Sequence, residues 1–239
     1  MSATGPRVVV SPHPDDAVWS LGGRLAKWAA AGEPAVVVTV FDGPGPLDPA
    51  EPWRAVADPR VRRAEDEAAL AGLGARRVSL GLPDAAVRTS GSQCRYTYSH
   101  PRRLFGPPSP RDAELADLLA ARLRPWLAAA AEVHAPLAAG RHVDHVLVRE
   151  AVAQLAPPRI AWYEEFPYPL RARDVSSLRE RRESLRPADL EQWLEGAGRY
   201  ASQARILCGD VPGLRAALTR RAREHASGTG LAYADRHWV

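Results

Sequence analysis

Two short stretches of this sequence place histidine and aspartate at spacings that suit a metal ion. The first covers residues 12–16 (PHPDD) and the second covers residues 142–145 (HVDH), about half a chain away. In each stretch two ligand-type side chains stand three residues apart, so they can point the same way where a loop enters a helix. Two histidines and one carboxylate that leave a position open for water are typical of a catalytic zinc site. Together, the two stretches predict a metal centre.

The residues of these stretches divide into ligands and groups for proton transfer. We expect His13 and Asp16 to bind the metal together with one histidine of the second stretch. Asp15 is next to a ligand in the sequence but must point elsewhere, which makes it the candidate general base for a metal-activated water. The other histidine could stabilise an oxyanion or protonate a leaving amine, with Asp144 orienting an imidazole. Such a set of groups would hydrolyse an amide.

Each aspartate also has a simpler interpretation as a helix N-cap. Aspartate is a favoured N-cap residue, so Asp15 or Asp16 could cap the helix that follows them, and Asp144 could cap a helix beginning at His145. A single histidine is more often a surface or hydrogen-bonded residue than a ligand. Two strand-to-helix turns, each with histidine and aspartate at helical spacing, nevertheless favour the metal centre.

The apolar patterns around the two stretches predict how the chain brings them together. Residues 7–11 and 35–41 are continuous apolar runs typical of buried parallel strands, and residues 17–31 between them have helical spacing. This order of strand, helix and strand is a βαβ unit. Because both histidine stretches follow predicted strands, we expect them at one edge of a sheet, where open α/β folds bind their ligands.

The rest of the chain continues to alternate between strands and helices. Further strands are predicted at residues 77–80, 132–135 and 159–163, further helices at residues 60–73, 111–131, 142–155, 188–207 and 211–224, and irregular loops at residues 42–59 and 82–110. This order predicts an α/β fold, a Rossmann-like three-layer sandwich with a mostly parallel sheet and helices on both faces. We expect a single domain over residues 1–239.

The composition argues against several classes of protein. Of the 239 residues, 46% are hydrophobic and 25% are charged, which is typical of a globular domain. No apolar window approaches the roughly 18 residues of a membrane span and no signal peptide is recognised, so we expect a cytoplasmic protein without a membrane span. Lys27 is the only lysine among 32 basic residues, and the arginines are scattered, so we expect no nucleic-acid partner. Cys94 and Cys208 lack the spacing of a thiolate metal site.

At these motifs the sequence resembles the LmbE-like, or PIG-L, family of zinc-dependent N-deacetylases that act on N-acetylglucosamine-type sugars. The resemblance runs in order from about residue 7 to residue 207. It rests on seven segments: PHPDD with Gly22-Gly23, residues 35–39 with Asp42-Gly43, Arg62 with Glu65, Leu82-Pro83-Asp84, the HVDH stretch, residues 163–168 (YEEFPY) and residues 200–203 (YASQ). One departure is Ala17, where many relatives carry glutamate.

The resemblance implies a role for each matched residue. The implied zinc ligands are His13, Asp16 and His145. Asp15 would be the general base, and His142 would stabilise the oxyanion or act as the acid, with Asp144 as its orienting partner. Arg62 and Asp84 would contact the substrate sugar or its substituent.

We therefore expect a Zn²⁺-dependent hydrolase that removes an N-acyl group, with acetyl as the expected group, from an amino sugar in a small-molecule glycoside, conjugate or natural-product intermediate. One alternative is an amidase that acts on a non-sugar amide with the same zinc site. Another is a non-haem Fe(II) oxygenase, since that metal also uses two histidines and one carboxylate, although an oxygenase needs no base beside its ligands. A third is an inactive binding module, disfavoured because every proposed catalytic residue is present. His225 and His237 are expected at the surface.

Overall fold

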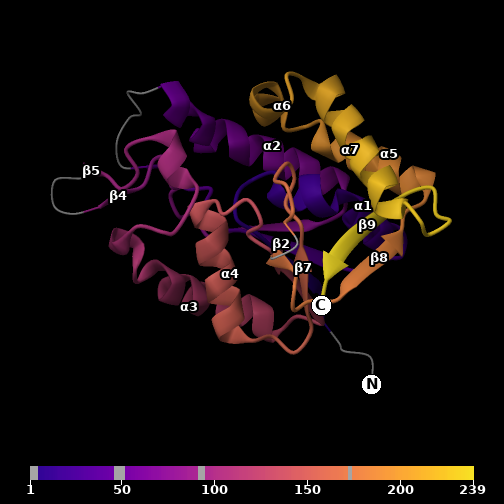
Figure 1. Cartoon of the computed structure of the whole chain (residues 1–239), viewed down its shortest axis with the longest axis horizontal. Coiled ribbons are helices and arrows are strands. Elements are labelled where there is room, and N and C mark those ends of the chain that lie inside the picture. Colours follow the sequence, from indigo (N-terminus) through magenta and orange to yellow (C-terminus); the bar gives the residue numbers. More distant parts are fainter. Residues whose placement is uncertain (1–4, 46–51, 91–94, 172–173) are drawn as a thin grey trace.

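The computed structural model of this chain describes residues 5–45, 52–90, 95–171 and 174–239 (Figure 1). In chain order the strands and helices are β1 (Arg7–Ser11), α1 (Asp16–Ala30), β2 (Ala35–Thr39), α2 (Pro59–Gly72), β3 (Arg76–Ser79), β4 (Thr89–Ser90), β5 (Arg95–Tyr96), α3 (Leu115–Ala128), β6 (Glu132–Pro136), α4 (Val143–Leu155), β7 (Ile160–Tyr163), β8 (Glu180–Ser184), α5 (Pro187–Ala197), α6 (Ala201–Leu207), α7 (Val211–Ala226) and β9 (Ala234–Trp238). Short 3-10 helices cover Pro52–Ala57, Pro101–Leu104 and Pro110–Asp112. Within the described ranges, no helix combines the length and the hydropathy that a membrane span requires.

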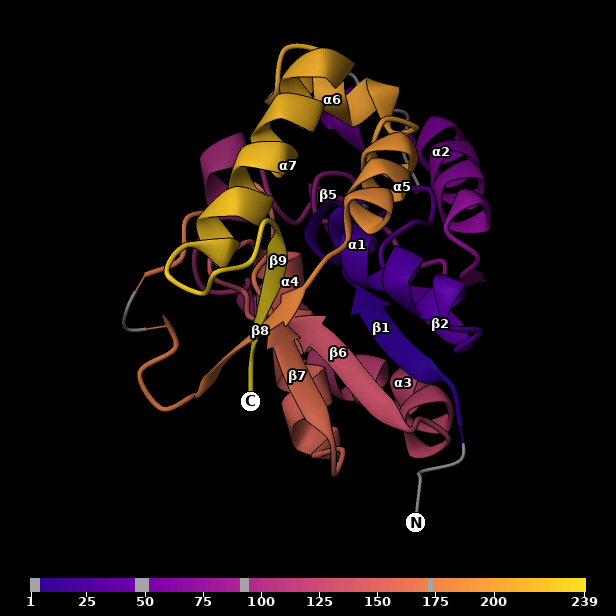
Figure 2. The same cartoon turned by 90° about the vertical axis from the view of Figure 1, so that its right-hand side faces the viewer.

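The main sheet of the described chain has the strand order β3-β2-β1-β6-β7-β9-β8. The first five strands in this order are parallel, and β9 runs antiparallel to both of its neighbours (Figure 2). The register pairs Val8 with Val36 and Val9 with Val37, so the apolar runs of β1 and β2 lie side by side. The predicted mostly parallel sheet is confirmed.

The alternation of side chains along β1 and β2 divides the core between the two faces of the sheet. Val9 and Val37 pack in a cluster with residues of α1, α2, α5 and α7. Val8 and Val38 pack in a second cluster with residues of α3 and α4. Because β1 is buried on both faces, its sequence is a continuous apolar run, as parallel strands between helices require. The predicted three-layer sandwich is confirmed.

The C-terminal third differs from the prediction in three ways. The predicted helix at 188–207 is two helices, α5 and α6, which are separated at Gly198–Tyr200. Strands β8 and β9 were not predicted, because their sequences ERRES and ADRHW lack an apolar run. His225 and His237 are both 5% exposed, so their predicted surface position is wrong. Trp193 and Trp238 also belong to the packed interior, with exposed fractions of 1% and 7%.

The predicted loops contain more regular structure than expected. Residues 82–110 include the antiparallel pair of β4 and β5 and the 3-10 helix Pro101–Leu104. The sequence predicts a loop there because prolines are frequent in this segment. Cys94 lies outside the described residues, and Cys208 is a free, partly buried thiol.

Candidate metal centre

The candidate site lies at the edge of the sheet between β1 and β6. Strands β2 and β3 follow on one side of β1, and β6 and β7 follow on its other side, so the order of the strands changes direction at this point. Strands β1 and β6 are neighbours, yet the chain leaves β1 into α1 on one face of the sheet and leaves β6 into α4 on the other face. The loops that follow the two strands therefore diverge and leave a crevice at the carboxyl edge, which is the usual ligand position in this class of fold. The first histidine stretch lies where the loop after β1 enters α1, and the second lies where the loop after β6 enters α4, at the predicted edge of the sheet.

The loop after β1 is held by short-range hydrogen bonds. The Ser11 hydroxyl donates to the carbonyl oxygen of His13 at 2.7 Å and accepts from the backbone NH of Ala17 at 3.0 Å. Asp16 Oδ2 accepts from the backbone NH of His13 at 2.9 Å. Asp15 occupies the N-cap position of α1 with φ 102°, and its side chain makes no capping hydrogen bond. Neither carboxylate is thus used as a conventional N-cap, and the strained backbone of Asp15 turns it away from Asp16.

Three ligand-type atoms converge in a small triangle. His13 Nδ1 lies 3.3 Å from Asp16 Oδ2, His145 Nε2 lies 3.2 Å from the same oxygen, and the two nitrogens are 3.3 Å apart. Tetrahedral zinc with bonds of about 2.0–2.1 Å separates its ligand atoms by about 3.3–3.4 Å. The triangle therefore has the size and the donor chemistry of a zinc site.

A wider set of donors surrounds this triangle. Ligand atoms of His13, His142 and His145 lie within 4.8 Å of one another, as do those of His13, Asp84 and Asp144. The triangle with Asp16 is the tighter arrangement, and it combines two neutral donors with one anionic donor. A metal ion could be held there, with His142 at the border of the site.

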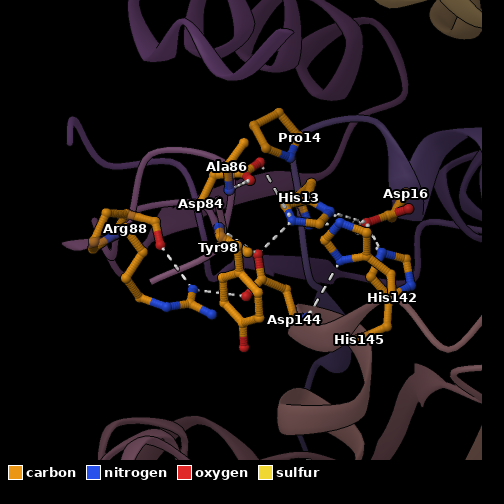
Figure 3. A network of polar contacts seen from close by, with 12 residues as sticks. His13, Pro14, Asp16, Asp84, Ala86, Arg88, Tyr98, His142, Asp144 and His145 are labelled. Atoms are coloured by element: carbon orange, nitrogen blue, oxygen red, sulfur yellow. Dashed lines mark hydrogen bonds and ion pairs between the residues drawn. The ribbon is translucent and has the colours of Figure 1, made fainter. Parts of the chain in front are cut away.

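Each ring of the triangle has a carboxylate at its outer nitrogen, and Figure 3 shows the contact between His13 and Asp144. His13 Nε2 lies 3.0 Å from Asp144 Oδ2, and His145 Nδ1 lies 2.9 Å from Glu165 Oε1. A carboxylate that holds the outer nitrogen of a metal-binding histidine fixes the ring and increases its basicity. Glu165 was missed as a site residue, although it lies in the YEEFPY segment that follows a predicted strand.

The partner of Asp144 differs from the expected one. Its carboxylate bonds to the ring of His13, whereas it contacts His142 through its backbone NH, which donates to His142 Nδ1 at 3.3 Å. The other carboxylate oxygen accepts from Arg88 Nη1 at 2.7 Å. Asp144 does orient an imidazole, but that imidazole belongs to the first stretch. Arg88, in the predicted loop 82–110, carried no signal in the sequence beyond its charge.

The electrostatics of the triangle favour a bound cation. Burial would lower the pKa of His13, but the charge of Asp84 and the hydrogen bonds of Asp144 and Asp16 outweigh burial and raise this pKa to about 10. Burial would likewise lower the pKa of His145. The charges and hydrogen bonds of Asp16 and Glu165 outweigh burial and raise this pKa to about 9. The carboxylates that hold protons on the two rings would also stabilise a metal ion in their place.

Asp15 lies beside the triangle in a different environment. Burial raises its pKa to about 7, although the positive charge of Arg62 opposes this rise. Arg62 Nη2 lies 3.3 Å from both oxygens of Asp15, and its Nη1 donates to Asp84 Oδ2 at 3.2 Å. Arg62 and Asp84 line the same cavity as Asp15, so they are positioned to meet a ligand while they also bind each other.

His142 caps the helix that carries His145. Its Nδ1 accepts the backbone NH of Asp144 and closes the first turn of α4, so its ring proton belongs on Nε2. Burial, together with the charge of His13, lowers the pKa of His142 well below its usual value. His142 is therefore a neutral ring at neutral pH, with an NH group available to a ligand in the cavity that it lines.

Comparison with known families identifies the family to which the chain belongs. Residues 8–156 match the family model of PIG-L, described as GlcNAc-PI de-N-acetylase. The chain belongs to this family. The match includes both histidine stretches, Arg62 and Asp84, and it confirms the resemblance seen in the sequence.

A curated relative of this PIG-L chain and several solved structures similar to it are deacetylases. It is 37% identical over 175 residues to 2'-N-acetylparomamine deacetylase of Streptomyces fradiae, a match that covers 69% of this chain. The chain spans 58% of the length of that curated relative. The structure is similar, with TM-score 0.82 and 25% identity over 98% of this chain and 97% of the other, to a zinc-inhibited form of the teicoplanin deacetylase Orf2. A deacetylase–bog complex from the biosynthesis pathway of teicoplanin has TM-score 0.79 and 25% identity, over 98% of this chain and 96% of the other.

Proposed function

We propose that this chain is a zinc-dependent N-deacetylase that hydrolyses the acetamido group of an amino sugar in a small-molecule glycoside, conjugate or natural-product intermediate. The observation that carries the proposal is the triangle of His13 Nδ1, Asp16 Oδ2 and His145 Nε2, with sides of 3.2–3.3 Å, beside the buried carboxylate of Asp15. The deacetylase relatives support both the reaction and the class of substrate.

The residues of the triangle would hold the zinc ion. When bound, zinc polarises an amide carbonyl and lowers the pKa of water to about 7. Asp144 and Glu165 keep the two imidazoles oriented toward the ion through their outer nitrogens. The PIG-L match and the carboxylate base beside the ligands both favour this hydrolase over the Fe(II) oxygenase considered from the sequence.

Asp15 is the proposed general base. Its buried carboxylate lines the cavity beside the triangle, where it can accept a proton from the attacking water and return that proton to the leaving amine. Arg62 holds the carboxylate in place and limits the rise of its pKa. Arg62 and Asp84 are proposed substrate contacts, because both line the cavity beside Asp15.

His142 is the proposed oxyanion stabiliser. Because its Nδ1 is occupied by a backbone NH and its pKa is low, the ring can donate from Nε2 but does not carry a second proton to give away. Of the two roles considered for this histidine, hydrogen-bond donation to the developing oxyanion is the better supported.

A screen for acetate release tests the proposal. The zinc-loaded protein is assayed on N-acetylated sugars, glycosides and nucleotide sugars, before and after chelation. We expect acetate from at least one class of amino sugar, loss of activity with the chelator and recovery with Zn²⁺. Full activity in metal-stripped protein, or no acetate from any substrate, would overturn the proposal. A cytoplasmic location and a single domain over residues 1–239 stay predictions.

A further inference from the structure

The cavity above the triangle is too small for a whole glycoside. Its volume is about 150 Å³, whereas sites that enclose a drug-sized ligand measure about 300–1,000 Å³. The walls near the triangle are His13, Asp15, Asp84 and His142. The enclosed space thus suits an acetamido group with part of its sugar, and the remainder of the substrate must lie across the mouth.

Apolar and aromatic side chains from separate parts of the chain also line this cavity, and two of them, Phe105 and Leu207, are half exposed. We call this set the apolar collar; its members are Val56, Leu104, Phe105, Phe166, Tyr168 and Leu207. The Phe105 and Tyr168 rings lie 6.1 Å apart between centroids, and the Phe105 ring lies 5.5 Å from that of His142. The collar therefore begins directly beside the proposed oxyanion stabiliser.

Two members of the collar are unusually exposed. Phe105 and Leu207 are each 50% exposed, and Ile206, next to Leu207 on α6, is 55% exposed. The Phe105 backbone is held against the second histidine stretch by a bridge to His142 and by the hydrogen bond from Gly106 NH to Arg141 O at 2.8 Å. Apolar side chains held in contact with water around a site mark a surface that a ligand covers.

The charged groups that line the cavity bind one another. Asp15 and Asp84 are paired with Arg62, and Asp16 faces the two histidines of the triangle. Gln203 and the hydroxyl group of Tyr168 are further polar groups among the described lining residues, and Gln203 Nε2 donates to Val56 O at 3.0 Å. The apolar collar thus offers apolar contact rather than carboxylates for ammonium groups.

We propose that the apolar collar binds an apolar, aromatic aglycone, so that the substrate is an N-acetylamino sugar attached to an aromatic group rather than to a polycationic aminocyclitol. This inference rests on the proposed deacetylase function, because it assumes that the acetamido group enters the cavity. Aromatic rings and branched aliphatic side chains bind such a group through burial of apolar surface and ring contacts.

Two glycosides that differ in the aglycone alone test the inference. The p-nitrophenyl and methyl glycosides of N-acetylglucosamine, in both anomers, are compared with the zinc-loaded protein by calorimetric affinity and by kcat/KM. An N-acetylated aminoglycoside is the cationic competitor. We expect the aromatic glycoside to bind about tenfold more tightly than the methyl glycoside, which corresponds to about 1.4 kcal/mol. Equal affinities, or stronger binding of the cationic competitor, would overturn the inference.

Substitutions in the apolar collar test whether the collar causes the preference for the aromatic glycoside. We expect Phe105→Ala and Leu207→Ala to reduce the ratio of the two affinities severalfold toward one. Leu118→Ala, a change at a leucine of α3 that is 45% exposed, is the matched control and should leave the ratio unchanged. An unchanged ratio in both collar variants contradicts the inference. Affinity is measured independently of turnover, so a failure to release acetate would count against the proposed function, whereas a missing preference for the aromatic glycoside counts against the collar.

Discussion

Two adjacent aspartates of the first histidine stretch acquire opposite properties from their surroundings. Asp16 faces His13 and His145, and these partners overcome the effect of burial and lower its pKa below the usual range. Burial instead raises the pKa of Asp15 to about 7, despite the charge of Arg62. The positive φ of Asp15 separates the two side chains, because it directs them into different environments. Identical residue types thus suit metal binding and proton transfer respectively.

Replacing Asp15 tests this separation. We expect Asp15→Asn to retain stoichiometric zinc, because the triangle is untouched, and to lose about 10²–10⁴-fold in kcat, the usual contribution of a general base. Asp117→Asn, at an exposed position on α3, is the control. Metal analysis and acetate release provide the readouts. Near wild-type turnover in Asp15→Asn would show that another group takes the proton.

Replacing Glu165 tests the support of a ligand. We expect Glu165→Ala to weaken zinc binding about 10–100-fold, since the outer nitrogen of His145 loses its carboxylate. Glu165→Gln keeps an acceptor oxygen without the charge and should fall between Ala and wild type. Competition with a zinc chelator gives the affinities. Equal affinity in all three proteins would contradict a role for Glu165 in positioning His145.

At the scale of elements, the close approach of α1 and α5 depends on glycine. A Cβ atom on Gly22 would lie 2.1 Å from Cδ1 of Trp193, and one on Gly23 would lie 2.6 Å from a methyl group of Leu185. The Trp193 ring uses this space to donate from Nε1 to Val18 O at 2.7 Å. Because α1 also begins with Asp16, the glycine pair helps to place the helix that carries one proposed ligand.

A substitution at Gly22 should disturb this packing. Alanine favours a helix over glycine by about 1 kcal/mol, but overpacking of a dense core costs about 1–3 kcal/mol. We expect Gly22→Ala to lower the free energy of unfolding, measured with denaturant. The control is Gly72→Ala in α2, where a Cβ would have no heavy atom within 4 Å, and it should be neutral or stabilising. A stabilised Gly22→Ala protein would show that Trp193 moves away freely.

At the scale of the molecule, the C-terminal segment completes one end of the sheet. After α7, the chain returns as β9 between β7 and β8, as the yellow arrow in Figure 1 shows. Arg236 Nη2 donates to Glu164 Oε2 at 2.7 Å, and Glu164 adjoins Glu165, which contacts His145. Burial, together with the charges of Arg221 and Arg236, lowers the pKa of His225 to about 2, and burial and Arg24 lower that of His237 to about 4.

These two histidines should destabilise the fold in acid. Their pKa values are below the unfolded value of about 6.5, so the unfolded chain binds more protons and stability falls as the pH drops below about 6.5. Each histidine removes up to about 1.4 kcal/mol per pH unit, down to about pH 4 for His237 and about pH 2 for His225. Denaturant unfolding of His225→Phe between pH 7 and pH 5 should give a shallower dependence of stability on pH than unfolding of the unchanged protein. Identical slopes would contradict the assignment.

The sequence by itself determined the parallel part of the sheet and the residue types of the site. Strands such as β1 and β2 are apolar throughout because helices cover both faces, and metal and proton chemistry need histidine and aspartate at close spacing. Only the tertiary structure decided that His145 completes the triangle while His142 caps α4, and that Asp144 and Glu165 hold the outer nitrogens. It also decided the places of β8, β9 and the buried histidines. These features depend on contacts between segments far apart in the chain, which no local pattern of residues encodes.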